Sequence, residues 1–168
     1  MSFFKNLRNN CSFLVFLLGS SQQTAILSIL TFCIELRHLN LGSCVRIEDY
    51  DVVASMLAAR CRSLCSVDLW RCRNLTDRGL AELVSGCRML EELDLGWCPT
   101  LQSSTGCFQH LARSLPRLRK LFLTANRTVC DSDVEELAAS CPSLQHLDIL
   151  GKRFPHTYSM WTQTFVIY

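Results

Sequence analysis

The sequence predicts an α/β solenoid, in which short parallel strands line one face of a stack and helices line the other. A pattern C-x2-L-x2-L-x-L-x2-C begins at Cys61, with Val67 at its second leucine position, and begins again 26 residues later at Cys87. Each L-x-L segment alternates as a half-buried strand does, and an apolar run with helical spacing follows it. Self-similarity at a period of about 20–50 residues is typical of stacked repeats. We therefore expect function on an extended surface and not in a catalytic pocket.

Length and composition are those of one ordinary domain. The chain has 168 residues and 49% hydrophobic content, which suffices for a single core. The formal net charge is +2, and charges of both signs are mixed along the chain. Because there is no basic face and no block of like charge, we expect no nucleic-acid partner.

Residues 1–21 do not fit the repeat, and we assign them to a hydrophobic leader. Lys5 and Arg8 precede an apolar run that ends at Leu18, and small residues follow it, which is the outline of a signal peptide. We favour a leader without a targeting role, because the domain behind it has the features of an intracellular protein. A membrane span is not expected, since the run is shorter than about 20 residues.

Residues 22–32 are expected to form the helical half of a repeat whose strand is missing. The apolar residues Ile26, Ile29 and Cys33 have the same spacing as those of the helix that ends at Cys87. Apolar residues at this spacing form one face of a helix.

Five repeat units follow and, with that helix, make up residues 22–151. They start near residues 33, 61, 87, 115 and 141, in steps of 28, 26, 28 and 26 residues. Polar residues that suit a helix start follow the strands; they are Glu48, Asp49 or Asp51 in the first unit, Thr76 or Asp77 in the second, and Asp131, Ser132 and Asp133 in the fourth. The leucine spacing stops after residue 151, and residues 152–168 form a non-repeat tail.

The repeat explains most of the 11 cysteines. One repeat position holds Cys33, Cys61, Cys87 and Cys141, and another holds Cys44, Cys72 and Cys98, with Asn126 in the fourth unit. Such cysteines are expected to be small buried hydrophobes in a reducing compartment, with disulfides or metal as the alternatives. The spacings around Cys65 are poor for a closed zinc site. The Asn/Cys exchange favours a residue that bonds backbone groups in a turn, so we expect neither metal nor cofactor.

These repeats resemble the cysteine-containing class of leucine-rich repeats, which is found chiefly in F-box proteins. The matching segments are LNLGSCVRIEDYDV, LDLWRC, EELDLGWCPTLQSSTGCF, KLFLTAN and LDILG, within residues 24–151. The resemblance implies a leucine-rich-repeat horseshoe with its parallel sheet on the concave face and helices on the convex face. It also implies that the chain recognises a protein substrate in a Skp1–cullin–F-box (SCF) type E3 ubiquitin ligase, without catalytic residues of its own.

The resemblance also sets expectations about the rest of the molecule. We find no F-box, so we expect the chain to be a C-terminal fragment, from a truncated isoform or an incomplete gene model. Skp1 and cullin are then partners only of a full-length relative. The expected location is the cytoplasm or nucleus, with mitochondrial association as an option by resemblance, and not secretion. The alternative function is a stand-alone or truncated scaffold without a ligase role.

Residues between the core leucines are expected to point to the concave face. The candidate partner-binding residues are Asp68, Trp70, Arg71, Glu92, Asp94, Trp97, Lys120, Phe122 and Asp148. Aromatic anchors with an acidic surround are typical of protein-binding patches, which favours a basic or mixed segment as the ligand. The alternative is that the aspartates are merely solvated and the tryptophans pack on neighbouring units.

No arrangement of residues predicts catalysis. His38 and His146 share a repeat position but are four strands, about 19 Å, apart, and His110 and His156 lie elsewhere. Three cysteines, Cys65, Cys107 and Cys130, lie outside the repeat positions, but no histidine is placed to activate them. We therefore predict that the chain is not an enzyme.

Overall fold

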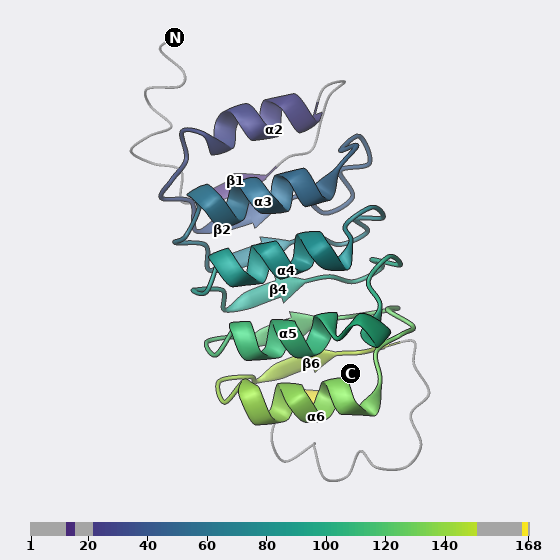
Figure 1. The fold of residues 1–168 in the computed structure, drawn as a ribbon. Coiled ribbons are helices and arrows are strands. Elements are labelled where there is room, and N and C mark those ends of the chain that lie inside the picture. The colour runs from purple at the N-terminus through teal and green to yellow at the C-terminus, as the bar shows by residue number, and fades with distance from the viewer. Residues whose placement is uncertain (1–12, 16–21, 151–165, 168) are drawn as a thin grey trace.

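The computed structural model describes residues 13–15, 22–150 and 166–167. Most of the leader 1–21 and of the tail 152–168 therefore lies outside the described residues, and the division of the chain into leader, repeats and tail stays a prediction. The described part is a stack of strand–helix units with one parallel sheet, covered on one side by a row of helices (Figure 1). This is the predicted leucine-rich-repeat solenoid.

The strands follow one another in the sheet in chain order. In the described part the sheet has seven strands: β1 (Phe13–Val15), β2 (His38–Asn40), β3 (Ser66–Asp68), β4 (Glu92–Asp94), β5 (Lys120–Phe122), β6 (His146–Asp148) and β7 (Val166–Ile167). All neighbours are parallel, and equivalent repeat positions are paired, so that Leu39 lies beside Val67 and Val67 beside Leu93. Each repeat position therefore becomes a column across the sheet.

The helices lie in a row on the other side of the core. They are α2 (Gln22–Leu30), α3 (Tyr50–Arg60), α4 (Asp77–Gly86), α5 (Cys107–Ser114) and α6 (Asp131–Ser140), with a short 3-10 helix, η1 (Ser103–Thr105), before α5. The predicted core face of α4 is confirmed, because Leu80, Leu83 and Val84 are fully buried. Helix α2 confirms the helix expected over residues 22–32.

A strand at each end of the sheet was not predicted. Strand β1 pairs with β2, with Leu14 beside Leu39, so the expectation that the first helix lacks a strand was wrong. Strand β7 pairs with β6 at the other end, with Ile167 beside Leu147. An open sheet edge presents unpaired N–H and C=O groups, and a strand of two or three residues covers these groups without needing leucine spacing.

The cysteines of the first repeat position, Cys33, Cys61, Cys87 and Cys141, are buried at the ends of the helices. The backbone N–H of Cys61 donates to the carbonyl of Leu57 at 2.8 Å, and its thiol donates to the carbonyl of Cys33 at 3.4 Å. The thiol of Cys87 donates in turn to the carbonyl of Cys61. None of the ten described cysteines forms a disulfide. The predicted role of these cysteines in the core is thus confirmed.

The second column explains why cysteine and asparagine can exchange. The thiols of Cys72 and Cys98 donate to the carbonyls of Leu41 and Leu69, one strand back, at 3.8 and 3.2 Å. In the next unit, Asn126 Nδ2 donates to the carbonyl of Leu95 at 2.8 Å. Both side chains therefore supply a donor to the carbonyl that ends the preceding strand.

The helix starts are joined from one repeat to the next. Asp49 caps α3 as predicted, since its carboxylate accepts the N–H of Val52 at 3.1 Å. Thr76 stands at the N-cap of α4, but its hydroxyl does not cap that helix and donates instead to Asp51, whose other oxygen accepts the Thr76 N–H at 2.8 Å. The first turn of α3 thereby fixes the turn that begins α4.

The later helix starts also use acidic groups, one of which is buried. Asp77 accepts the N–H of Gln102 at 2.9 Å and so repeats the link made by Asp51. At the start of α6 the capping box joins Asp133, which is fully buried, to Cys130, whose N–H donates to Asp133 Oδ2 at 2.9 Å. The acidic residues expected at this helix start are confirmed, and one of them is part of the core.

We expect Asp51→Ala to lower the free energy of unfolding by about 1–2 kcal/mol, because the Thr76 N–H loses its acceptor. Asp51→Asn keeps an acceptor for that N–H, so its loss should be less than half as large. Urea unfolding followed by circular dichroism measures both. Equal stability of the Ala variant and the unmodified chain would show that this link contributes nothing to the stack.

Candidate protein-binding face

The predicted binding residues lie on the exposed side of the sheet and at the edge where the strands end. Asp68, Asp94 and Asp148 occupy the last strand position in β3, β4 and β6, and each is half-buried. Phe122 takes the same position in β5. The parallel register therefore places these residues in one column across the concave face.

The aspartates in this column have a structural role that the sequence did not reveal. Asp68 Oδ1 accepts the N–H of Trp70 at 2.9 Å, and Asp94 Oδ1 accepts the N–H of Gly96 at 2.8 Å. Asp148 makes the same bond to Leu150 at 2.9 Å. A side chain that bonds the backbone two residues on forms an Asx turn. One oxygen of each carboxylate is thus engaged in the turn that ends the strand.

The third residue after the strand is left-handed in four successive repeats. Ser43, Arg71, Trp97 and Ala125 have φ between 57° and 63°. Few residues other than glycine adopt this region, at a cost of about 1–2 kcal/mol per residue. The N–H of Trp97 donates to the carbonyl of Thr124 at 2.8 Å, and the N–H of Arg71 donates to that of Gly96. The sheet ladder therefore holds these residues in place.

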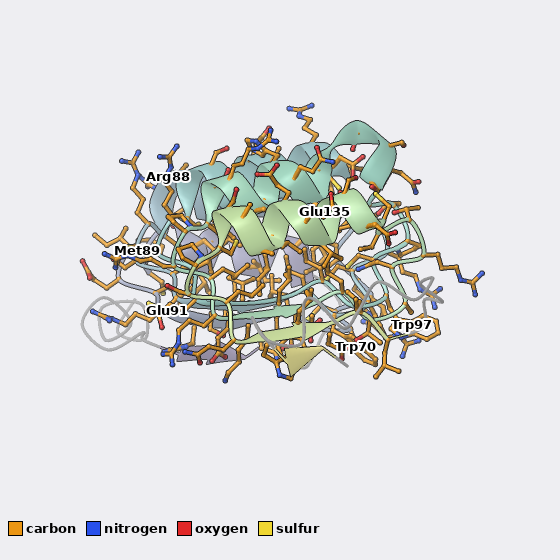
Figure 2. The ribbon with its side chains drawn as sticks, turned by 90° about the horizontal axis from the view of Figure 1, so that it is seen from below. Trp70, Arg88, Met89, Glu91, Trp97 and Glu135 are labelled. Carbon is orange, nitrogen blue, oxygen red and sulfur yellow. The ribbon has the colours of Figure 1, made fainter. Side chains whose placement is uncertain are left out.

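This backbone turn brings both tryptophans to one edge of the molecule. Figure 2 shows Trp70 and Trp97 together at the strand-exit edge, and Arg88 and Met89 at the opposite edge. Trp97 is 56% exposed and Trp70 is 38% exposed. We call the loops that follow β2 to β5, residues 41–46, 69–74, 95–100 and 123–128, the strand-exit edge.

Trp70 is partly held by its neighbours, whereas Trp97 projects further into solvent. The Arg71 guanidinium carbon lies 5.1 Å from the centre of the Trp70 ring, a cation–π distance. Trp70 also lies against Gly96, where an added Cβ would be 2.9 Å from its ring carbon Cδ1. Glycine at position 96 therefore makes room for the ring, so packing on a neighbouring unit applies in part to Trp70.

The other predicted residues form pairs on the concave face. Lys120 Nζ lies 2.7 Å from Glu92 Oε1 on the adjacent strand, an ion pair between exposed groups. The rings of Phe122 and His146 lie 5.0 Å apart, centre to centre, at a tilt of 47°. A hollow of about 240 Å³ between the strands is lined in part by Asp68, Glu92, Asp94 and Phe122.

Burial raises the pKa of Asp94 to about 6. The charges of Asp68 and Asp148 contribute to this rise in the pKa, and the hydrogen bond from the Gly96 N–H opposes it. The Asp94 carboxyl is thus partly protonated near pH 6.

A second hollow lies at the strand-exit edge and contains residues that the sequence did not single out. It has a volume of about 420 Å³, and Arg71, Arg73, Trp97, Asn126 and Arg127 are among its lining residues. Arg73 and Arg127 each follow the Cys/Asn position of their repeat. That shared position was the available signal, but it lies beyond the leucine pattern that defined the repeat.

The buried repeat cysteines hold protonated thiols, and two of the histidines lie far apart in the sheet. Burial raises the pKa of Cys61 to about 11 and that of Cys98 to about 12, so these thiols stay protonated at neutral pH. His38 and His146 lie on β2 and β6, four strands apart, as predicted, and His156 is outside the described residues. Among the residues that the structure describes, no three His, Cys, Asp or Glu side chains are grouped to hold a metal. Nor is any helix in that part of the chain both long and apolar enough to cross a bilayer.

Comparison with known proteins identifies the kind of repeat. A family model described as Leucine Rich repeat matches residues 86–104. F-box/LRR-repeat protein 4 of Bos taurus is 70% identical over 123 residues, which is 73% of this chain and 20% of that protein. Putative F-box/LRR-repeat protein 23 of Arabidopsis thaliana is 33% identical over 101 residues, 56% of this chain and 22% of its own length. The chain spans about a fifth of the length of these curated relatives.

Solved structures show the same fold. A chain in the crystal structure of the Rad7 and Elc1 complex of yeast matches with a TM-score of 0.65 and 22% identity, over 83% of this chain and 35% of its own. An internalin, InlF, of Listeria monocytogenes matches with a TM-score of 0.56 and 22% identity, over 83% of this chain and 38% of its own. Both likenesses support the solenoid.

The raised pKa of Asp94 predicts a pH-dependent stability. The unfolded carboxyl has a pKa of about 3.9, so between that pH and about 6 the folded chain holds a proton that the unfolded chain has lost. The contribution of Asp94 to the free energy of unfolding therefore falls as the pH rises through this window. After allowance for solvent screening, we expect a loss of about 1 kcal/mol.

The variant Asp94→Asn isolates this effect. Asparagine can still accept the Gly96 N–H, as Asn40 accepts the N–H of Gly42 at 2.9 Å in an earlier repeat. We expect Asp94→Asn to be more stable than the unmodified chain at pH 7 by about 1 kcal/mol, with the gap closing near pH 4. Urea unfolding at the two pH values measures this. A gap that does not change with pH would contradict the burial of the carboxylate charge.

Proposed function

Since the chain carries the leucine-rich repeats of the F-box/LRR-repeat family, we propose that it recognises a protein substrate for an SCF-type ubiquitin ligase. In this role the solenoid holds the substrate, and other subunits transfer ubiquitin to it, so the chain needs no catalytic group. Skp1 and cullin would be contacted through an F-box in a full-length protein. Such a function belongs in the cytoplasm or nucleus, where ubiquitin ligases act on folded proteins.

The observation that carries the proposal is Trp97. Its side chain is 56% exposed on a backbone held at φ 57°. The fold does not demand tryptophan at this position, because Ser43 and Ala125 adopt the same conformation in other repeats. Exposed aromatic side chains are among the residues that contribute most to protein–protein binding. Trp97, Trp70 and the adjoining strand ends are therefore the proposed contact surface.

The concave residues extend this surface. Phe122 and the aspartates adjoin the strand-exit edge at the ends of strands β3 to β6, and Lys120 lies at the start of β5 on the same sheet. An interface of ordinary size buries about 800 Å² on each partner. The concave face and the strand-exit edge together offer a continuous area on which a partner can lie across several repeats, as the solenoid geometry favours.

We expect Trp97→Ala to weaken binding of a partner at least about 30-fold, which corresponds to the loss of about 2 kcal/mol or more at a binding hot spot. Met89→Ala is the matched control, since Met89 is 40% exposed at the opposite edge. Partners recovered with the unmodified chain are quantified by mass spectrometry and then titrated against each variant. The proposed surface is wrong if the two variants behave alike.

The ligase role is tested separately from the surface. The chain is fused to an F-box module and expressed in cells, and the half-life of each Trp97-dependent partner is measured with and without proteasome inhibition. We expect the fusion to shorten that half-life and the Trp97→Ala fusion to leave it unchanged. A partner that binds the fusion but keeps its half-life would favour the scaffold alternative.

A further inference from the structure

The groove at the strand-exit edge is lined by positively charged side chains. Each aspartate at the end of β3, β4 and β6 uses one carboxylate oxygen in an Asx turn. The groove beside these turns is lined by Arg71, Arg73 and Arg127 and by no acidic residue. The composition of the strands suggested an acidic surface, but the loops that follow them present a basic one.

The groove arginines form no ion pair with the described residues, whereas four other basic side chains do. The ion pairs there are Arg78–Glu82, Arg113–Glu136, Arg119–Glu91 and Lys120–Glu92. None of them involves an arginine of the groove, within the residues that the structure describes. Guanidinium groups with five fixed donors pair strongly with carboxylates. The groove thus presents cationic donors for which the described part of the chain supplies no carboxylate.

The spacing of two arginines suits an extended chain. Arg73 and Arg127 occupy the same repeat position in the loops after β3 and β5, with Pro99 between them in the loop after β4. Two strand spacings separate these loops by about 10 Å. A peptide in the extended polyproline II conformation advances about 9 Å in one three-residue turn, which places its side chains i and i+3 on the same face. These two side chains would therefore reach both arginines.

Between the arginines, the groove is lined partly by apolar side chains. The Trp97 ring forms one side, and buried Leu101 lies among the lining residues. Asn126 is 5% exposed, and its Oδ1 has no hydrogen-bond partner among the described residues. This residue lines the groove, but the oxygen itself is buried. The volume of about 420 Å³ holds a few side chains.

We propose that this groove binds an extended acidic segment of a partner protein, with two acidic residues three positions apart and an apolar residue between them. The proposal rests on the protein-recognition function above and names the chemistry of the partner. It differs from the basic or mixed segment that the aspartate column suggested, because arginines line this groove and the aspartates Asp68 and Asp94 line the separate hollow on the concave face.

A selection from random peptides tests the proposal directly. The full chain is immobilised, and twelve-residue peptides displayed on phage are selected against it. We expect enrichment of peptides with Asp or Glu at i and i+3 around an aliphatic residue. Enrichment of basic peptides, or of none above the level retained by the double variant Arg73→Glu/Arg127→Glu, would overturn the inference.

A matched control is available at the opposite edge. Arg62 and Arg88 also follow equivalent cysteines, are also exposed, and line a separate hollow there. The double variant Arg62→Glu/Arg88→Glu therefore makes the same change of charge away from the groove. Thermal unfolding of both double variants shows that each is folded before binding is compared.

The strongest acidic peptide is then synthesised with a fluorescent label and titrated by anisotropy. We expect Arg73→Glu/Arg127→Glu to weaken its binding at least about 100-fold, about tenfold for each charge-assisted contact, and Arg62→Glu/Arg88→Glu to change it less than threefold. Equal affinities for the two double variants would refute the groove. If Trp97→Ala still abolishes binding of a whole partner in that case, the proposed function stands and only its acidic ligand is wrong.

Discussion

The structure depends on hydrogen bonds that each repeat makes to the backbone of its neighbour. The carbonyl that ends one strand accepts a donor from the Cys/Asn column of the next unit, as Leu95 does from Asn126. The turn at the start of a helix is fixed by an acidic group of the preceding helix, as Thr76 is by Asp51. Buried backbone groups must be paired, and in the strands and the turns beside them the adjacent unit supplies many of the partners. Because each unit must place the same donors and acceptors beside its neighbour, the sequence repeats every 26 or 28 residues.

The same constraint determines where side chains are displayed. Because the ladder continues past the strand, the third residue after each of β2 to β5 adopts a left-handed conformation, and the chain turns outward there. The positions of Arg71 and Trp97 at the edge are therefore fixed by backbone bonding, while their identity is left open to selection. A rigid scaffold with variable residues at a fixed edge is well suited to recognition, since little side-chain or loop ordering is needed on binding.

The repeats and most of the core could be predicted because apolar spacing and burial have the same period. The Cys/Asn exchange was likewise interpretable, since both residues offer a donor. Three features could not be predicted from spacing. Strands β1 and β7 pair through backbone groups that any sequence supplies. Asp68 and Asp94 appeared to be surface charges because an Asx turn depends on local backbone geometry. Arg73 and Arg127 follow the last patterned residue of their units, so only the folded loops bring them to one groove.

The central claim is that a partner protein is recognised at the strand-exit edge and the adjoining concave face. Hydrogen–deuterium exchange of the chain, with and without a purified partner, tests it most directly because it reports every amide at once. The account predicts that slowing of exchange on binding concentrates in residues 69–74, 95–100 and 123–128. Protection confined to helices α3 to α6, or to the opposite edge around Arg62 and Arg88, would contradict it.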